Sequence, residues 1–418
     1  MTETTNDLAA PLAAEAERVL RRNWREGTHA DGTAYAFTCP GAPRYRHQWH
    51  WDSCFNAVAW ARFDSARARA ELRTILRSGR GDGFLPHTVF WDRPARWRRA
   101  PLYATLRVRG DRATESIGPP LLAWAWERVA AASPDEPGFA REALGALTAH
   151  LDWLARERDP DGDGLLTILL PDESGLDDSP KYDPVFGRLA HHRPGYARLV
   201  QRCRRLGWRA DRITAAHEEH LEDVWVNVCY ALSLRALGRL SGEGGWSARA
   251  ARTEAALLER CLDPATGLFL DLAGRDETPV RVSTWSALSP LLLEDLPGAV
   301  RRRLVEEHLL DARRYRAACG IPSVAMDEPS FRPGFDLWRT WRGPSWTNVT
   351  WLLVGPMRDL GYEDDAARVR LSLARAARAH GLREYYDPRT GRGLAARHFG
   401  WSALVADLAE PGSTDHRG

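Results

Sequence analysis

Lysine is almost absent from this chain. Lys181 is the only lysine, so arginine supplies 57 of the 58 basic residues. Such a skew reflects a GC-rich genome more than a function. The 56 acidic residues nearly balance the basic ones and leave a net charge of +2. This balance argues against a basic stripe for nucleic acid, so nucleic acid is not an expected partner.

Cysteine is also scarce, and its spacing is irregular. The chain has six cysteines and no C-x-x-C pair, so the sequence predicts neither a zinc site nor a disulfide framework. The expectation is buried thiols in a reduced compartment. The six are Cys39, Cys54, Cys203, Cys229, Cys261 and Cys319.

Long apolar runs are missing. No window approaches 18 apolar residues, which excludes a membrane-spanning helix, and we expect no membrane partner. Residues 1–7 are polar and acidic, without the basic and apolar regions of a signal peptide. The expected location is therefore the cytoplasm.

Runs of alternating β-branched residues are nearly absent, and helical periodicity takes their place. The spacing predicts eleven or twelve helices, and no linker divides the chain, so we expect one domain over residues 1–418. About a dozen helices in one domain predict an all-α (α/α)6 barrel, a toroid of helical hairpins, with long functional loops. Helices are predicted at 8–24, 52–63, 66–78, 115–132, 137–157, 221–240, 246–261, 295–310, 345–360, 363–380 and 398–409. Long loops are predicted at 80–113, 158–220 and 318–344.

Tryptophan, in contrast, is abundant, with 18 residues. The flat apolar face of an indole matches the C–H face of a sugar ring, so this number favours a carbohydrate-binding cleft. A tryptophan-rich core combined with GC-rich codon usage is the alternative explanation.

Aromatic residues and an acid come together at residues 45–52. Tyr45, Trp49 and Asp52 share one face if this segment is helical. The aromatic rings could stack on a sugar while the carboxylate holds its hydroxyls. The structural alternative is that Asp52 and Ser53 cap the helix that begins there.

Two further segments carry candidate catalytic acids. Residues 171–180 form a turn-rich loop with Asp172, Glu173, Asp177 and Asp178, and such a loop can aim one carboxylate inward. Glu384 lies in a second segment near the C-terminus. Two carboxylates on separate loops amid many tryptophans indicate glycoside hydrolysis, although sequence cannot give the separation that distinguishes inverting from retaining enzymes.

The loop Asp159-Pro-Asp-Gly-Asp-Gly164 imitates the start of a calcium-binding loop. Leu170 stands where the twelfth position of such a loop needs a glutamate. We therefore expect a tight turn here and no metal site.

Taken together, these segments resemble glycoside hydrolase family 63, in the clan shared with the family 37 trehalases. They follow the family's order across residues 45–405. The segments are Trp51–Phe55, Gly83–His87, Glu173–Pro180, Glu222–Asn227, Gly320–Ser323, Trp341–Trp346, Glu384–Asp387 and Gly393–Trp401. The resemblance implies an (α/α)6 barrel and an inverting mechanism without metal or organic cofactor. It implies Asp177 as general acid and Glu384 as general base. The substrate-binding residues it implies are Tyr45, Trp49, Asp52, His87, Trp341, Arg342 and Trp346.

The length of the chain is similar to that of the bacterial mannosylglycerate and glucosylglycerate hydrolases in this group. Their anionic aglycone implies an arginine clamp from residues 186–213. One departure from the family pattern is Gly118, where a glutamine is usual, and it leaves the substrate specificity open. The candidate arginines are Arg188, Arg193, Arg198, Arg202, Arg204, Arg205, Arg209 and Arg212.

The leading prediction is an inverting α-glycosidase that acts on a small α-glucoside or α-mannoside, a glucosylglycerate or mannosylglycerate. The first alternative is an α-glucosidase or trehalase-like hydrolase of disaccharides or oligosaccharides. A sugar isomerase or epimerase would use paired histidines, for which the chain offers His191-His192 and His217 with His220. A non-catalytic sugar binder is the fourth alternative. The expected partner is a small carbohydrate, and a homo-oligomer is neither excluded nor established.

Overall fold

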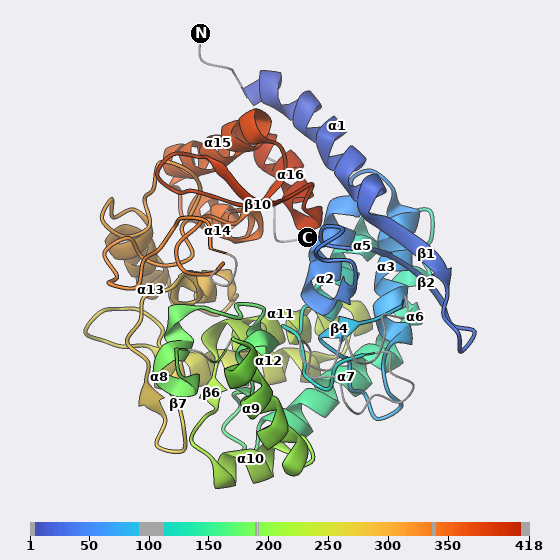
Figure 1. Cartoon of the computed structure of the whole chain (residues 1–418), viewed down its shortest axis with the longest axis vertical. Coiled ribbons are helices and arrows are strands. Elements are labelled where there is room, and N and C mark those ends of the chain that lie inside the picture. The colour runs from blue at the N-terminus through green and yellow to red at the C-terminus, as the bar shows by residue number, and fades with distance from the viewer. Residues whose placement is uncertain (1–4, 92–112, 189, 191, 337–339, 411–418) are drawn as a thin grey trace.

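Helices make up most of this chain and surround a common centre (Figure 1). The computed structural model describes residues 5–91, 113–188, 190, 192–336 and 340–410. The longer helices are α1 (Thr5–Asn23), α2 (His50–Ala61), α3 (Ser65–Arg77), α5 (Leu122–Ala131), α7 (Leu144–Arg158), α9 (Arg193–Arg205), α11 (Val224–Ser241), α12 (Gly244–Ala256), α14 (Thr347–Asp359) and α15 (Glu363–His380). The shorter ones are α6 (Phe139–Glu142), α8 (Asp183–Phe186), α10 (Ala210–Ala216), α13 (Gly298–Arg303) and α16 (Val405–Ala409).

Six elements form a closed inner ring. Two of them are 3-10 helices, η5 (Trp285–Leu292) and η7 (Gly400–Leu404). Around the ring, α2 packs on α5, α5 on α11, α11 on η5, η5 on α14, α14 on η7, and η7 on α2. These elements are buried along most of their length, and most of their residues are apolar.

A second layer of helices covers this ring from outside. Helix α3 packs on α2, α7 and α12 pack on α11, and α15 packs on α14, while α1 packs on η7 and α16. The outer helices α3 and α15 each have one buried face and one exposed face.

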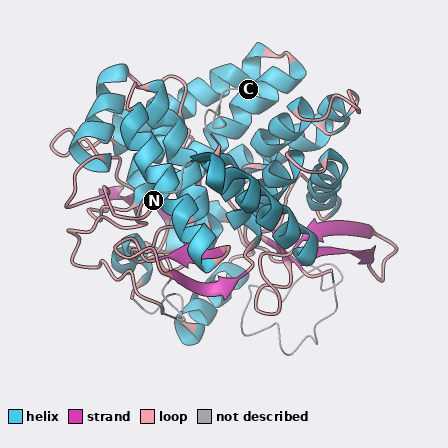
Figure 2. Cartoon of the chain, turned by 90° about the horizontal axis from the view of Figure 1, so that it is seen from above, coloured by secondary structure: helices cyan, strands magenta, loops and turns pink. Residues whose placement is uncertain are grey.

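Ten short strands lie among the described residues and gather on one side of the helical body (Figure 2). All pairings are antiparallel. The four-stranded sheet has the order β5-β6-β7-β8, and β1 pairs with β2, β3 with β4, and β9 with β10. The strands are β1 (Trp24–Thr28), β2 (Ala34–Thr38), β3 (Gln48–Trp49), β4 (Thr88–Val89), β5 (Thr167–Ile168), β6 (Leu221–Glu222), β7 (Leu272–Ala273), β8 (Thr278–Pro279), β9 (Arg383–Tyr386) and β10 (Gly393–Arg397).

The predicted helices are confirmed in most places, and the differences have local causes. The helix expected from residue 115 begins only at Leu122, because Pro119 and Pro120 remove N–H donors and disfavour helical geometry before them. The helix expected at 137–157 is divided into α6 and α7. The all-α description also leaves out the ten short strands, most of which are too short to show alternation.

The predicted loop 158–220 contains three helices, α8, α9 and α10, so its description as a loop is wrong. A signal for α9 was available: Leu199, Val200 and Cys203 are buried at helical spacing. The arginines that surround these three residues in α9 made the apolar spacing difficult to detect. Most of the loop expected at 80–113, namely 92–112, lies outside the described residues.

The only lysine is one of the most deeply buried residues. Lys181 Nζ lies 2.8 Å from an Asp223 oxygen and 3.1 Å from an Asp271 oxygen, and it donates to Ser286 Oγ at 2.9 Å. Asp223 also accepts the N–H of Val226 and so caps α11. The ammonium group therefore joins the chain near residue 180 to α11, to η5 and to the segment before β7.

Replacing Lys181 with methionine should lower the free energy of unfolding by about 3–5 kcal/mol, because two buried carboxylates lose their cation. Urea unfolding followed by circular dichroism measures this change. Arg209→Met is the matched control, since Arg209 forms an exposed ion pair with Asp211 that contributes little to stability. Equal losses in the two variants would contradict the role of the buried cation.

Candidate active site

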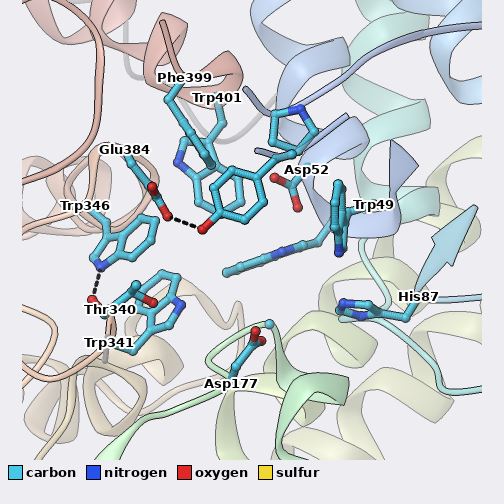
Figure 3. A pocket seen from close by; sticks show the side chains of 14 residues that line it. Trp49, Asp52, His87, Asp177, Thr340, Trp341, Trp346, Glu384, Phe399 and Trp401 are labelled. Atoms are coloured by element: carbon cyan, nitrogen blue, oxygen red, sulfur yellow. Dashed lines mark hydrogen bonds between the residues drawn. The ribbon is translucent and has the colours of Figure 1, made fainter. Parts of the chain in front are cut away.

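A pocket opens among the segments that the sequence motifs had singled out (Figure 3). Its lining residues come from β3, the start of α2, the loop after β5, the segment before α14, β9 and the chain around η7. The residues that line it are Pro40, Tyr45, Trp49, Trp51, Asp52, His87, Gly175, Asp177, Thr340, Trp341, Trp346, Glu384, Phe399 and Trp401. Eight of the nine predicted site residues are therefore brought together, and Arg342 is the exception.

Asp52 lies in the first turn of α2, three residues after β3. The helix begins at His50 with Trp49 as its N-cap, so the interpretation of Asp52 and Ser53 as the cap is wrong. The N-terminal end of the helix dipole favours a carboxylate at this position. Burial, followed by the nearby Asp177 carboxyl, raises the pKa of Asp52 well above its usual range.

The four acids of the loop 171–180 have different surroundings. Glu173 is fully buried and accepts two hydrogen bonds from Arg158, at 2.9 and 2.6 Å, and one from each of two backbone N–H groups. Asp172 accepts from Tyr196 Oη at 2.9 Å, and Asp178 accepts from the N–H of Trp341 at 3.1 Å. Only Asp177 lines the pocket.

Gly175 makes the turn that presents Asp177. It ends the 3-10 helix Pro171–Ser174 in the left-handed conformation, with a φ of 72°. A Cβ at this position would lie 2.5 Å from Cε2 of Trp51. The loop can therefore approach the pocket wall this closely only with glycine.

The side chain of Asp177 is exposed where it lines the pocket, while the residues on both sides of it in the chain, Leu176 and Asp178, are buried. Burial raises the pKa of Asp177 to about 7, and the negative charges of Asp178 and Glu384 add to this increase. Asp177 thus keeps its proton to a higher pH than an ordinary aspartate.

Glu384 faces Asp177 from the other side of the pocket (Figure 3). It lies on β9, where Tyr45 Oη donates to its Oε1 at 2.8 Å and the N–H of Ala396 donates to its Oε2 at 3.1 Å. Burial raises the pKa of Glu384, whereas these two donors and the Arg44 charge favour the ionised form. The two facing carboxyls therefore differ in their surroundings, since each oxygen of Glu384 receives a hydrogen bond from another segment of the chain.

Indole rings build one wall of the pocket. Trp341 and Trp346 stack with ring centroids 4.0 Å apart and planes 5° apart. Trp401 packs edge-on against Trp346 at 5.7 Å and against Trp51 at 4.9 Å. Other tryptophans, such as Trp60 and Trp225, are fully buried and do not line the pocket. The tryptophans are therefore divided between the wall of the pocket and the core.

Arg342 does not line the pocket. Its guanidinium donates to both oxygens of Asp183 at the start of α8, at 2.9 and 2.6 Å. This pair holds the segment that carries Trp341 against α8. As a binding residue for substrate, Arg342 stays a prediction from resemblance alone.

His87 lines the pocket as a neutral imidazole, because burial lowers its pKa to about 4. A Cβ on Gly118 would lie 2.9 Å from the Cβ of His50 and 3.3 Å from Nδ1 of His87. The two histidines thus occupy the space that a side chain at position 118 would need.

The other candidate residues lie elsewhere or outside the described residues. His217 and His220 do not line the pocket, and Nδ1 of His220 contacts the carbonyl of His217 at 2.9 Å. His191 and the side chain of Arg193 are not described. None of the other seven candidate arginines is a lining residue. Arg202, for example, donates to the carbonyls of Leu169 and Glu219, each at 2.6 Å.

Sequence reasoning missed several lining residues. Trp51 and Trp401 stood inside the quoted motifs but were not named as site residues. Trp51 could have been identified because it is adjacent to Asp52, and Trp401 because it is the last residue of the motif 393–401. Pro40 and Thr340 carried no signal, because they lie in irregular chain that only tertiary packing brings to the pocket.

Comparison with known proteins assigns the class. Residues 45–402 match the family model described as the mannosylglycerate hydrolase MGH1-like glycoside hydrolase domain. A crystal structure of the GH63 mannosylglycerate hydrolase from Thermus thermophilus, in complex with glucose, superposes with a TM-score of 0.81 at 32% identity and covers 96% of this chain and 99% of that one. The fold and the site thus define a glycoside hydrolase, and the resemblance to family 63 is confirmed.

The chain belongs to the MGH1-like glycoside hydrolase family. Its relatives include a mannosylglycerate hydrolase from Thermus thermophilus, 32% identical over 94% of this chain and 99% of the relative. A glucosylglycerate hydrolase from Mycolicibacterium hassiacum is 27% identical over 86% of this chain and 91% of the relative. Neutral trehalase from Saccharomyces cerevisiae, with a TM-score of 0.60 and 16% identity, covers 94% of this chain and 79% of the trehalase and shares the fold. None of the described helices has an apolar stretch long enough to pass through a bilayer.

Replacing Gly175 with alanine should destabilise the loop that carries Asp177, because it adds a clash with Trp51 to the left-handed backbone strain. The expected loss in free energy of unfolding is about 2–4 kcal/mol. Gly242→Ala is the matched control: Gly242 is also a left-handed C-cap, with a φ of 77°, and has no atom within 4 Å of its would-be Cβ. Urea unfolding of both variants measures the difference, and equal losses would contradict the close approach.

Proposed function

We propose that this protein is an inverting α-glycosidase that acts on a small anionic glycoside, glucosylglycerate or mannosylglycerate. The observation that carries the proposal is the pair Asp177 and Glu384, which face each other across an aromatic pocket in unlike environments. A glycosidase needs one protonated and one ionised carboxyl at the same pH.

In the proposed mechanism, Asp177 donates its proton to the glycosidic oxygen as the bond to the anomeric carbon breaks. Glu384, whose ionised form is favoured by the hydrogen bonds from Tyr45 and the N–H of Ala396, accepts a proton from a water molecule. That water attacks the anomeric carbon from the face opposite the leaving group, which inverts the configuration. After the reaction Asp177 is ionised and Glu384 is protonated, so a proton returns through solvent before the next cycle.

The remaining lining residues would bind the sugar. Asp52 keeps a proton more readily than an ordinary aspartate, so it can donate as well as accept hydrogen bonds with sugar hydroxyls. The indole wall would cover the C–H face of the ring. His87 is neutral and lines the pocket, so its ring is a further contact for the sugar.

We also propose that the inner ring and its outer cover form an (α/α)6 barrel within one domain over residues 1–418. The closed sequence of contacts from α2 around to η7 supports this architecture. The cytoplasmic location and any oligomeric state stay predictions.

The names of the relatives support a glycerate aglycone, since three of the matched proteins are a mannosylglycerate hydrolase, a glucosylglycerate hydrolase and a mannosylglycerate hydrolase crystallised with Tris and D-glycerate. We assign no candidate arginine to the carboxylate, because none of those described lines the pocket. The trehalase-like alternative rests on likeness of fold.

The test is hydrolysis of glucosylglycerate, mannosylglycerate, trehalose, kojibiose and nigerose, followed by proton NMR from the first minutes. The expected result is turnover of one or both glycerates with initial release of the β-anomer. Turnover of only the disaccharides would support the α-glucosidase alternative. Initial release of the α-anomer would contradict inversion, and no turnover of any substrate would favour the non-catalytic binder.

Asp177→Asn and Glu384→Gln should each lower kcat by about a hundred- to ten-thousandfold, because each removes one proton-transfer group without changing side-chain size. Steady-state kinetics measures the loss. Asp172→Asn is the matched control: it lies in the same loop but does not line the pocket, so its kcat should change far less. Near wild-type kcat in Asp177→Asn or Glu384→Gln would contradict the role assigned to that residue.

The profile of kcat/KM against pH should be bell-shaped. Asp177 acts protonated, so activity falls as the pH rises through its pKa of about 7. Glu384 acts ionised, so activity also falls as the pH drops below its raised pKa. Tyr45→Phe removes a donor that favours ionised Glu384 and should move the acidic limb to higher pH, while the alkaline limb stays in place as an internal reference. Movement of the alkaline limb alone would contradict these assignments.

A further inference from the structure

A chain of buried hydrogen bonds joins the loop of Asp177 to helix α11. Tyr182 Oη lies 2.6 Å from Ser174 Oγ and 2.7 Å from Asp223 Oδ2. These three residues are at most 2% exposed, and none of them lines the pocket. A phenol oxygen can both donate and accept, so Tyr182 can hold both neighbours at once. We refer to Ser174, Tyr182 and Asp223 as the buried hydrogen-bond chain.

One end of this chain is fixed to the inner ring. Asp223 is the N-cap of α11, where it accepts the N–H of Val226 at 3.0 Å. The ammonium group of Lys181 pairs with the same carboxylate at 2.8 Å. A buried carboxylate with these partners cannot turn away without leaving a charge uncompensated, so Asp223 gives Tyr182 a fixed partner.

The other end of the chain holds the residue directly before Asp177. The N–H of Leu176 donates to Ser174 Oγ at 3.0 Å, and the carbonyl of Leu176 accepts the N–H of Ser179 at 2.8 Å. Both polar backbone groups of Leu176 are therefore bound. Since the direction of a side chain follows from the backbone that carries it, Ser174 helps to set the direction in which Asp177 points.

Asp177 depends on its backbone more than Glu384 does. The two oxygens of Glu384 accept hydrogen bonds from Tyr45 and from the N–H of Ala396. Among the described residues, the hydrogen bond that the Asp177 carboxyl receives comes from its own backbone N–H. A general acid must lie within hydrogen-bond reach of the oxygen that it protonates. The groups that hold the backbone of this loop therefore decide whether Asp177 is correctly placed.

We propose that Tyr182 is a positioning residue for the general acid. Through Ser174 and the backbone of Leu176, it holds the Asp177 carboxyl within reach of the glycosidic oxygen. The proton still passes from Asp177 to that oxygen as the bond to the anomeric carbon breaks, and Tyr182 itself transfers no proton. This inference rests on the proposed function, because it takes Asp177 as the general acid.

The test compares two leaving groups in Tyr182→Phe, which removes the phenol oxygen and keeps the ring. For the glycerate glycoside that the parent hydrolyses, kcat should fall about ten- to a hundredfold, because a small displacement of the acid slows proton transfer. For the α-fluoride of the same sugar, kcat should stay within about twofold of the parent value, because fluoride leaves without a proton. KM for the glycoside should change little, since Tyr182 does not line the pocket.

Equal losses on the two substrates would overturn the proposal, because general disorder of the site slows both reactions. Unchanged kcat on the glycoside would overturn it as well. Tyr315→Phe is the matched control: Tyr315 is fully buried, its Oη lies 2.9 Å from Ser283 Oγ, and it does not line the pocket. The ratio of the two kcat values in Tyr315→Phe should equal that of the parent.

Ser174→Ala removes the next member of the buried hydrogen-bond chain and gives a result even if Tyr182→Phe fails to fold. It should show the same selective loss on the glycoside. In a Ser174→Ala background, Tyr182→Phe should lower kcat by less than about a further twofold, because both substitutions act through one chain. Losses that multiply in the double variant would overturn the shared path.

Asp177→Asn distinguishes failure of this inference from failure of the proposed function. It should lower kcat on the glycoside far more than kcat on the fluoride. If it does not, Asp177 is not the general acid and the proposed function fails. If it does and Tyr182→Phe does not, only the positioning role is wrong.

Amide hydrogen exchange at residues 174–178 gives a readout that needs no substrate. Tyr182→Phe should accelerate this exchange by about tenfold or more, because the loop loses its connection to α11. Tyr315→Phe should leave it unchanged. Exchange at parent rates in Tyr182→Phe would overturn the proposal.

Discussion

The arrangement of this site depends on buried ion pairs that hold the segment 171–182 in place. At its start, Glu173 receives two hydrogen bonds from Arg158, at the end of α7. At its end, Lys181 lies between Asp223 and Asp271. Both pairs are shielded from water, so neither end can move without exposing a charge to an apolar interior. Asp177 is held between these two anchors and points into the pocket.

The same constraint explains how neighbouring acids in one loop come to have different roles. Glu173 forms an ion pair with Arg158 and accepts hydrogen bonds from two backbone N–H groups, so its role is structural. Asp178 receives a backbone N–H from Trp341 and thereby joins the loop to the opposite wall. Asp177 faces the pocket instead. Burial raises the pKa of both Asp177 and Asp178 to about 7, so access to the pocket is what separates these two acids. The environment, and not the residue type, separates these carboxyls.

The elements that line the pocket and the sheet that supports the loop of Asp177 are different parts of the molecule. The inner ring presents α2 and the segment before α14 to the pocket, while the four-stranded sheet supports the loop of Asp177 from behind. This separation is consistent with a pocket whose lining needs only side chains and water for the proposed reaction.

Much of this protein could be predicted from residues alone. Helical periodicity predicted most of the long helices, because burial of one face or all faces leaves a pattern along the chain. The acids and tryptophans around Asp52, Asp177 and Glu384 suggested glycoside hydrolysis, and the resemblance to family 63 implied the role of each residue. The helix α9 was hidden because its few buried positions stand among arginines.

What the sequence by itself determined was therefore most of the long helices and, through the resemblance to family 63, the class of enzyme. Only the tertiary structure decided which of four adjacent acids enters the pocket, that Arg342 pairs with Asp183, and that Glu222 and Glu277 join an aspartate turn. The physical reason is the range of the interactions. Periodicity and turn chemistry act between neighbours in the chain, whereas ion pairing and burial depend on segments 15 to more than 100 residues apart, such as Arg158 with Glu173 and Arg342 with Asp183.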